Sequence, residues 1–189
     1  MSTKENKVSG IMYYSLYKSP VGQLTIAGDD ENITGLWLEG QKYFGSTLSG
    51  EKILAKDMAV FKQAVDWLER YFAGEKPLPS ELPLAPQGSE FRQAVWDVLC
   101  EIPYGEVITY GDIAKRIAAR KGVETMSAQS VGGAVGHNPI SIIIPCHRVV
   151  GSNGSLIGYA GGIERKKWLL AHEGIDMSQF YVPMKGTAL

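Results

Sequence analysis

The chain has 189 residues, of which 44% are hydrophobic and 21% charged, and its formal net charge is -1. These values are typical of a folded protein, and they exclude both a wholly disordered chain and a strongly cationic nucleic-acid binder. No apolar run approaches the length that spans a bilayer, about 20 residues. The polar segment 1–10 lacks the apolar core of a secretory signal. We therefore expect a cytoplasmic protein with no membrane partner.

The first part of the chain predicts a sheet followed by a helix. Three segments rich in Ile, Leu, Tyr and Thr, separated by turn residues, predict an antiparallel meander over 11–17, 23–27 and 33–38. Apolar residues at helical spacing then predict one helix, with Asp57 as its N-cap and Gly74 as its end. This combination predicts a small α/β unit.

A proline-rich segment separates this unit from the rest of the chain. Residues 75–88 contain four prolines and few helix formers, so they predict an extended linker. We therefore expect an N-terminal domain over 1–88, which includes the linker, and a C-terminal domain over 89–189. Ser89 is the expected N-cap of the first helix in the second domain.

The second domain predicts short helices. Thr109 and Ser127 are expected N-caps of two helices separated by a break at Gly122, and a last helix is expected over 163–173. Two short helices around such a break indicate a helix-turn-helix. Between 115 and 148, five basic residues stand against one acidic residue, which could attract phosphates or simply form a solvated face.

Cys146 is the candidate nucleophile. It follows the isoleucine-rich run 140–144, and a buried cysteine is often only a small apolar side chain. Its neighbours favour chemistry, because His147 can act as a base and Arg148 adds positive charge, and either would lower the pKa of the thiol. Adjacent side chains of an extended segment point to opposite faces, so contact between the thiol and the imidazole needs a turn or a bridging water.

Other polar residues could support this nucleophile. Glu173, at the end of the last helix, can orient the imidazole as the third member of a triad. Asn138 could pin the Cys146 region by hydrogen bonds, and Tyr110 could protonate a leaving group. With only two cysteines and no paired ligand motif, the sequence predicts free thiols and no metal site, and Cys100 is expected to be inert packing.

Beyond these individual residues, several segments together resemble one family, the O6-alkylguanine-DNA alkyltransferases, also called methylated-DNA–protein-cysteine methyltransferases. The acceptor motif of that family is matched by PCHRVV at 145–150. The other matching segments occur in the same order and cover nearly the whole chain: SPVGQLTIAG at 19–28, FRQAVW at 91–96, PYGEVITYGDIA at 103–114, VGGAVGHN at 131–138 and WLLAHEG at 168–174.

The resemblance implies an α/β N-terminal domain, a small ribonuclease-H-like sheet with a helix, and a mainly α C-terminal domain with a winged-helix-like helix-turn-helix. It also implies a DNA repair protein that binds double-stranded DNA through the minor groove and flips out the damaged base. The alkyl group of O6-alkylguanine, and of O4-alkylthymine, would pass to Cys146 in a single irreversible turnover. We expect a monomer that needs neither S-adenosylmethionine nor another cofactor, and no metal.

The resemblance also implies a role for each candidate. Cys146 attacks the alkyl carbon as a thiolate, and His147 takes the thiol proton through a water, supported by Glu173. Asn138 holds the pocket, and Tyr110 donates a proton to the departing purine.

Contacts with DNA and with the extruded base are implied for a further set of residues. Gln129 stands where the family often has an arginine that fills the stack behind the flipped base, and Ala160 stands where some relatives have serine. The full set comprises Ala128, Gln129, Ser130, Gly132, Arg148, Val149, Tyr159 and Ala160.

Three alternatives use the same residues differently. A lesion-binding protein on this scaffold would not transfer the alkyl group, and the presence of Cys146 argues against it. A regulator that senses alkylation would need an additional metal-bearing domain. A cysteine hydrolase would need an oxyanion hole at Cys146 and would turn over repeatedly.

Overall fold

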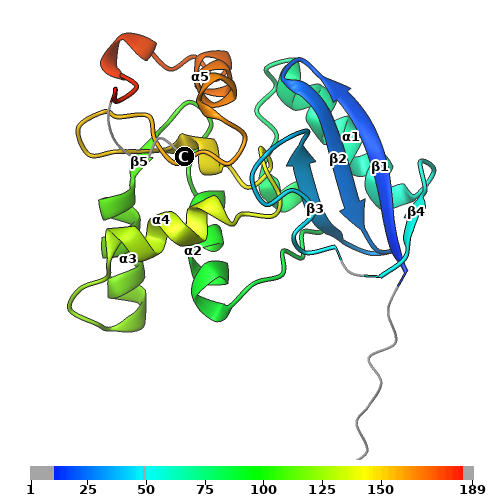
Figure 1. Ribbon diagram of the computed structural model, residues 1–189, viewed down its shortest axis with the longest axis horizontal. Coiled ribbons are helices and arrows are strands. Elements are labelled where there is room, and N and C mark those ends of the chain that lie inside the picture. The colour runs from blue at the N-terminus through cyan, green and yellow to red at the C-terminus, as the bar shows by residue number, and fades with distance from the viewer. Residues whose placement is uncertain (1–10, 49, 185–189) are drawn as a thin grey trace, which may run out of the picture.

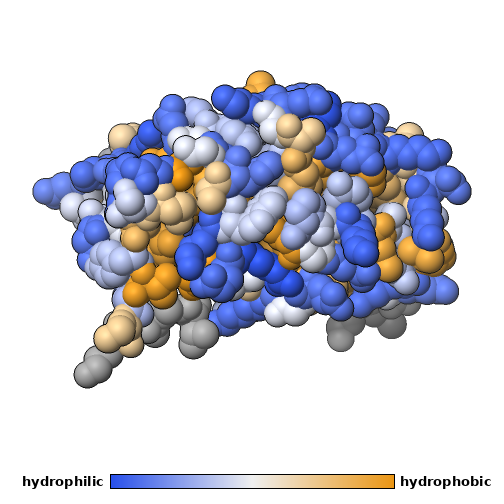
Figure 2. Space-filling model, turned by 90° about the horizontal axis from the view of Figure 1, so that it is seen from above, coloured by the Kyte–Doolittle hydropathy of each residue, from blue (hydrophilic) through white to orange (hydrophobic). Residues whose placement is uncertain are grey.

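The computed structural model describes residues 11–48 and 50–184, which form two lobes side by side (Figure 1). The segment 1–10, where no secretory signal is expected, lies outside the described residues. In the part of the chain that is described, no helix combines the length and the apolar character needed to cross a membrane. Hydrophilic side chains cover most of the face seen from above, with apolar side chains scattered between them (Figure 2).

The N-terminal lobe contains a four-stranded sheet in the order β3-β2-β1-β4. The first three strands confirm the expected antiparallel meander, since β1 pairs with β2 and β2 pairs with β3 in antiparallel register. The short fourth strand, which pairs in parallel with β1, is not predicted because its three residues show no alternating apolar pattern. The strands are β1 (Met12–Ser19), β2 (Gly22–Gly28), β3 (Ile33–Leu38) and β4 (Lys52–Leu54).

One helix, α1 (Ala59–Phe72), packs against this sheet and buries the apolar face that the sequence predicts. Its N-cap is Met58, in an extended conformation, and not the expected Asp57. Asp57 lies one residue too early to cap, and its exposed carboxylate instead approaches Lys62 at 3.7 Å. At the other end of the helix Tyr71 is fully buried, which brings a phenol into the interior.

The proline-rich segment is not a free linker. It contains a short 3₁₀ turn, η1 (Pro79–Glu81), and then runs along the free edge of β3. The Ile33 N–H donates to Pro83 O at 2.8 Å, and the Ala85 N–H donates to Ile33 O at 2.8 Å. Backbone hydrogen bonds to the sheet therefore hold the segment that the sequence predicts to be only extended.

The C-terminal lobe is mainly helical, as expected. Hydroxyls of Ser89, Thr109 and Ser127 cap the first three helices, in agreement with the sequence analysis. The helix that Thr109 caps ends at Gly122, which has φ 65°, a left-handed conformation that favours glycine. The elements are α2 (Glu90–Cys100), β5 (Ile108–Thr109), α3 (Tyr110–Lys121), α4 (Ala128–Gly136), η2 (Cys146–Arg148), β6 (Val149–Val150), α5 (Ile163–His172) and η3 (Met177–Gln179).

Helices α3 and α4 form the helix-turn-helix, and α2 supports them. The indole N–H of Trp96 on α2 donates to Ala134 O on α4 at 2.9 Å. One hydrophobic core continues from the sheet and α1 into the C-terminal helices. The edge of β3 also pairs with the chain after α4, because the Leu36 N–H donates to Pro139 O at 2.8 Å. The two lobes are therefore joined by backbone pairing as well as by apolar packing.

Candidate active site

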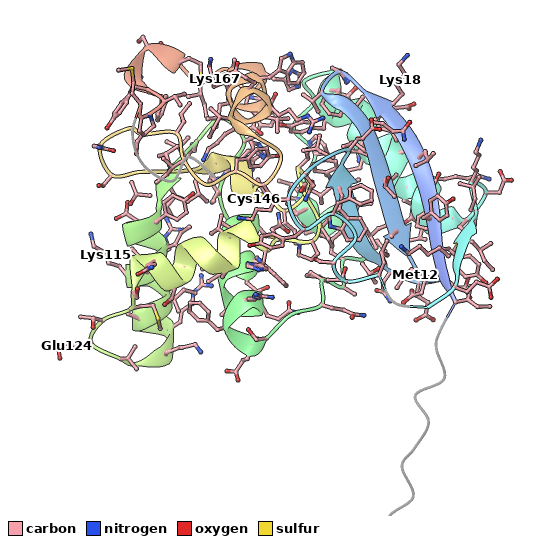
Figure 3. The ribbon with its side chains drawn as sticks, viewed as in Figure 1. Met12, Lys18, Lys115, Glu124, Cys146 and Lys167 are labelled. Atoms are coloured by element: carbon pink, nitrogen blue, oxygen red, sulfur yellow. The ribbon has the colours of Figure 1, made fainter. Side chains whose placement is uncertain are left out.

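Cys146 begins the 3₁₀ turn η2 and lies near the junction between the two lobes (Figure 3). Its side chain is nearly inaccessible, with 5% of the residue exposed. In a 3₁₀ turn, successive side chains are about 120° apart, so the opposite-face problem of an extended segment does not arise. The adjacent His147 is fully buried and points toward α5.

The imidazole of His147 meets the carboxylate of Glu173, which lies at the C-cap of α5. His147 Nε2 is 2.6 Å from Glu173 Oε1. The other ring nitrogen, Nδ1, is buried and has no hydrogen-bond partner among the described residues. A carboxylate only accepts hydrogen bonds, so Nε2 carries the proton in the neutral ring and Nδ1 keeps a free lone pair. Burial lowers the pKa of His147, although its hydrogen bond to Glu173 opposes that effect.

Several further donors converge on the same carboxylate. Arg148 donates to it twice, at 2.8 and 3.0 Å, the Tyr71 hydroxyl donates at 2.8 Å and the Gly105 N–H donates at 3.1 Å. Burial alone would raise the pKa of Glu173, but the hydrogen bonds from His147 and Arg148 hold it well below its usual range. The carboxylate therefore stays charged and orients the imidazole without taking its proton.

Arg148 does not occupy the position that the sequence analysis expects for a DNA contact. Its side chain is only 6% exposed, and its third nitrogen donates to Ile102 O at 2.6 Å. All of its nitrogens are thus used inside the protein. Its charge is paired with Glu173, and the cation that opposes the rise in the pKa of Cys146 is Lys166.

Burial raises the pKa of Cys146, and the polar side chain of Asn138 and the positive charge of Lys166 oppose that rise. The Lys166 ammonium is itself buried and donates to Val149 O at 2.5 Å and to Ile157 O at 2.8 Å. Burial lowers the pKa of this lysine to about 8. The resting site therefore holds a protonated thiol beside a buried cation and a neutral base.

Asn138 organises the chain that leads to the thiol. Its amide nitrogen donates to Ile144 O at 2.8 Å and to Ile140 O at 3.3 Å, and its amide oxygen accepts from the Ile140 N–H at 3.0 Å. Within this loop Ile142 has φ 69°, which a β-branched residue rarely adopts. The amide thus holds a strained loop directly before Cys146.

A cleft of about 610 Å³ lies between α4, Tyr110 and the loop 157–160, and neither Cys146 nor His147 is among the residues that line it. Four of the expected contact residues line it, together with Tyr110: Ala128, Gln129, Gly132 and Ala160. The remaining residues of the expected set do not. Ser130 is exposed elsewhere on α4, and both backbone groups of Val149 already have partners. Tyr159 is buried, and its hydroxyl has no hydrogen-bond partner among the described residues.

Tyr110 forms the inner wall of the cleft. Its hydroxyl donates to Ile157 O at 3.1 Å, and burial raises its pKa, so the phenol keeps its proton. Gly158 packs directly against this hydroxyl at φ 69°, and a Cβ there would lie 2.7 Å from the phenol oxygen. Only glycine fits both the conformation and the space, so the loop can approach Tyr110 closely.

Sequence reasoning missed several residues of this site. Tyr71 belongs to the apolar face of α1, and the only signal was that a buried phenol needs a hydrogen-bond partner. Lys166 sits between two other basic residues and gave no sign of burial. Lys42 and Tyr43 come from the N-terminal lobe, yet they line the cleft.

Both lobes of the structure match known protein families. Residues 12–86 match the family model described as "6-O-methylguanine DNA methyltransferase, ribonuclease-like domain", and residues 90–175 match the DNA binding domain of the same family. A methylated-DNA–protein-cysteine methyltransferase of Haemophilus influenzae is 45% identical, over 87% of each chain. One from Methanosarcina acetivorans is 46% identical, over 86% of this chain and 99% of that protein.

Solved structures agree with this comparison. The crystal structure of Mycobacterium tuberculosis OGT in complex with DNA is 43% identical, with a TM-score of 0.75, and the match covers 89% of this chain and 94% of that one. Fold and site together define a ribonuclease-like domain joined to a helix-turn-helix domain that carries a buried thiol. The chain belongs to the 6-O-methylguanine DNA methyltransferase family.

Proposed function

We propose that this protein repairs alkylated DNA by transferring the alkyl group of O6-alkylguanine, and of O4-alkylthymine, to its own Cys146. Family membership supports the reaction class. The observation that carries the assignment to this residue is the buried relay beside the thiol. In it, His147 Nε2 lies 2.6 Å from Glu173 Oε1 while Nδ1 has no protein partner among the described residues.

Activation of the thiol begins from the protonated state. Because burial raises the pKa of Cys146, little thiolate exists at rest, and a base must remove the proton. His147 accepts this proton at Nδ1 through a water, and Glu173 stabilises the resulting imidazolium. The polar side chain of Asn138 and the charge of Lys166 then stabilise the thiolate.

The transfer is a single displacement. The sulfur of Cys146 forms a bond to the alkyl carbon as the bond between that carbon and O6 of guanine breaks. The electron pair of the broken bond goes to the purine, and Tyr110 supplies a proton that avoids a free guanine anion. The proton that His147 took from the thiol then returns to the Tyr110 oxygen, so that the thiol proton is in effect passed to the purine. The product thioether does not hydrolyse readily, so each molecule reacts once, and the damaged base is the only alkyl donor required.

DNA binding follows from the family, and we propose that α4 enters the minor groove. Its cleft-facing residues Ala128, Gly132 and Gly133 are small, which permits close approach to the sugar-phosphate backbone. Gln129 lies at the cleft and would take the place behind the extruded base. We further propose that the protein acts as a monomer, with the domain boundary between Gly88 and Ser89.

The test combines intact mass with peptide mapping after the protein is mixed with a duplex that contains one O6-methylguanine. We expect a single added methyl group on Cys146, restored guanine and no second turnover. Cys100→Ser is the matched control and should react like the wild type, whereas Cys146→Ala should not react. Unmodified wild-type protein that still prefers the damaged duplex would instead indicate a lesion-binding protein, and no reaction with no preference would exclude both.

A further inference from the structure

The N-terminal lobe contributes one wall of the cleft, through the segment 39–44 that follows β3. Lys42 and Tyr43 from this segment line the cleft opposite residues of α4 and of the loop 157–160. The family's DNA-binding domain begins only at residue 90, so this wall lies outside the part of the chain that matches it. The match to the DNA-binding domain therefore does not account for these two residues at the cleft.

Cross-domain hydrogen bonds fix the wall in place. The side-chain oxygen of the buried Gln41 accepts from the Leu38 N–H at 2.7 Å and from the hydroxyl of Ser141 at 3.0 Å. Next along the chain, the Lys42 N–H donates to Ala160 O at 3.0 Å. The backbone of Lys42 is thus attached to the same loop that carries the expected base contacts.

Tyr43 is held in an unusual conformation at the rim of the cleft. Its φ is 61°, in the left-handed region that non-glycine residues seldom adopt. The ring stacks on His137, at the C-cap of α4, with 4.1 Å between centroids and an interplanar angle of 22°. Lys42 Nζ lies 5.2 Å from the centre of the same ring. Because Tyr43 remains 39% exposed, core packing does not account for this strain.

The charge of the wall points to its ligand. Among the described residues that line the cleft, Lys42 is the only one with a formal charge, and no acidic residue is present. The ammonium is exposed and has no carboxylate within ion-pair distance in the described part of the chain. An unneutralised cation at the rim of a cleft whose other described lining residues carry no formal charge suits the phosphate of a nucleotide whose base enters the cleft.

We propose that Lys42 binds the DNA phosphate beside the extruded nucleotide, and that Tyr43, stacked on His137, holds the lysine in position. The inference rests on the proposed function, because it takes the cleft as the place of the damaged base. It adds a DNA contact from the N-terminal domain. It also gives a reason for the strained backbone, since a relaxed loop would not carry the ammonium to this rim.

The experiment measures the rate of methyl transfer against the concentration of O6-methylguanine duplex, at several salt concentrations, for Lys42→Ala and for the control Lys18→Ala. Lys18 is an exposed lysine of the same domain, far from Cys146 (Figure 3). For Lys42→Ala we expect the negative slope of log affinity against log salt to become shallower by about 0.9. If the two proteins bind DNA equally at about 1 M salt, where the charge is screened, a slope difference of about 0.9 over one decade of salt gives a factor of about eight. The half-saturating DNA concentration of Lys42→Ala should therefore be about eightfold higher than that of the wild type at ~0.1 M salt. The rate at saturation should be unchanged, and Lys18→Ala should match the wild type.

Two further variants separate charge from structure. Lys42→Arg should restore the slope, and Tyr43→Ala should raise the half-saturating concentration although the lysine is still present. A Lys42→Ala slope equal to that of Lys18→Ala would overturn the inference, and so would failure of Lys42→Arg to restore it. In either case the proposed function would stand as long as Cys146 of the wild type accepts the methyl group from the damaged duplex. Absence of transfer by the wild type would instead overturn the proposed function itself.

Discussion

Tyr71→Phe removes one hydroxyl from the buried cluster around Glu173 and leaves the packing intact. The ring stacks on Trp67 at 5.5 Å and meets Tyr104 edge-on at 5.9 Å, contacts that phenylalanine keeps. A hydrogen bond to a charged group contributes about 1.5–3 kcal/mol to stability. Glu173 retains its bonds from His147, Arg148 and Gly105, so we expect the lower end of that range.

This substitution should also change the base. The Tyr71 hydroxyl shares Glu173 Oε1 with the imidazole, and so it offsets part of the charge that would stabilise imidazolium. Without the hydroxyl, the carboxylate favours the protonated ring more strongly, and the pKa of His147 rises. The rate of methyl transfer should therefore begin to fall at a higher pH than in the wild type as the solution is acidified.

The assay pairs calorimetry with the pH profile of single-turnover transfer. A loss of ~1.5 kcal/mol corresponds to a decrease in Tm of roughly 3–6 °C for a chain of this size. Tyr14→Phe, a half-buried tyrosine of β1, is the control and should leave both measurements unchanged. A lower Tm with an unshifted pH profile would show that the hydroxyl only supports the fold. An unchanged Tm with a superimposable profile would refute the reasoning entirely.

Three other changes test the site. Glu173→Gln leaves Arg148 buried without a counter-charge and should cost about 3–5 kcal/mol in urea unfolding at neutral pH. The pKa of Glu173 is depressed in the folded state, so the wild type should also lose stability as the pH falls below the ordinary value of 4.5, and the variant should lack that loss. Gln129→Arg adds a cation at the exposed start of α4 and should steepen the salt dependence of DNA binding by about 0.9, whereas an unchanged slope would place this side chain away from phosphates. Methylated Cys146 adds volume to a packed site and should lower stability by about 1–3 kcal/mol, which an unchanged Tm after reaction would contradict.

Local signals predicted most of the fold. Ser89, Thr109 and Ser127 begin helices because a hydroxyl at the N-cap satisfies a free backbone N–H, a need set within four residues of chain. The strands of the meander follow from residue type and turn spacing in the same way. The strand β4 is not predicted because a three-residue edge strand is too short to show an alternating pattern. The prediction of Asp57 as the N-cap of α1 is wrong by one residue, which is the usual precision of helix boundaries read from sequence.

The site was predictable where a motif placed chemistry side by side, as at Cys146 and His147. The contacts between the two lobes were not predictable. Tyr71 and Glu173 are 102 positions apart, and no periodicity connects a phenol on an apolar helix face to a carboxylate at a distant C-cap. Arg148 shows the converse error, because a basic residue in a DNA-binding domain suggests phosphate, whereas here the nearest anion lies inside the protein.

The burial of the nucleophile has a consequence for a protein that reacts once. Oxidants and electrophiles react mainly with the thiolate form of cysteine. A thiol whose pKa is raised by burial therefore stays protonated and is protected from these side reactions. Burial likewise raises the pKa of Cys100, the other thiol, to about 11. In the proposed mechanism, reactivity at Cys146 is produced by His147, whose orientation depends on Glu173 and, through Tyr71, on the N-terminal domain. In that mechanism the ribonuclease-like domain would contribute to the chemistry as well as to the fold.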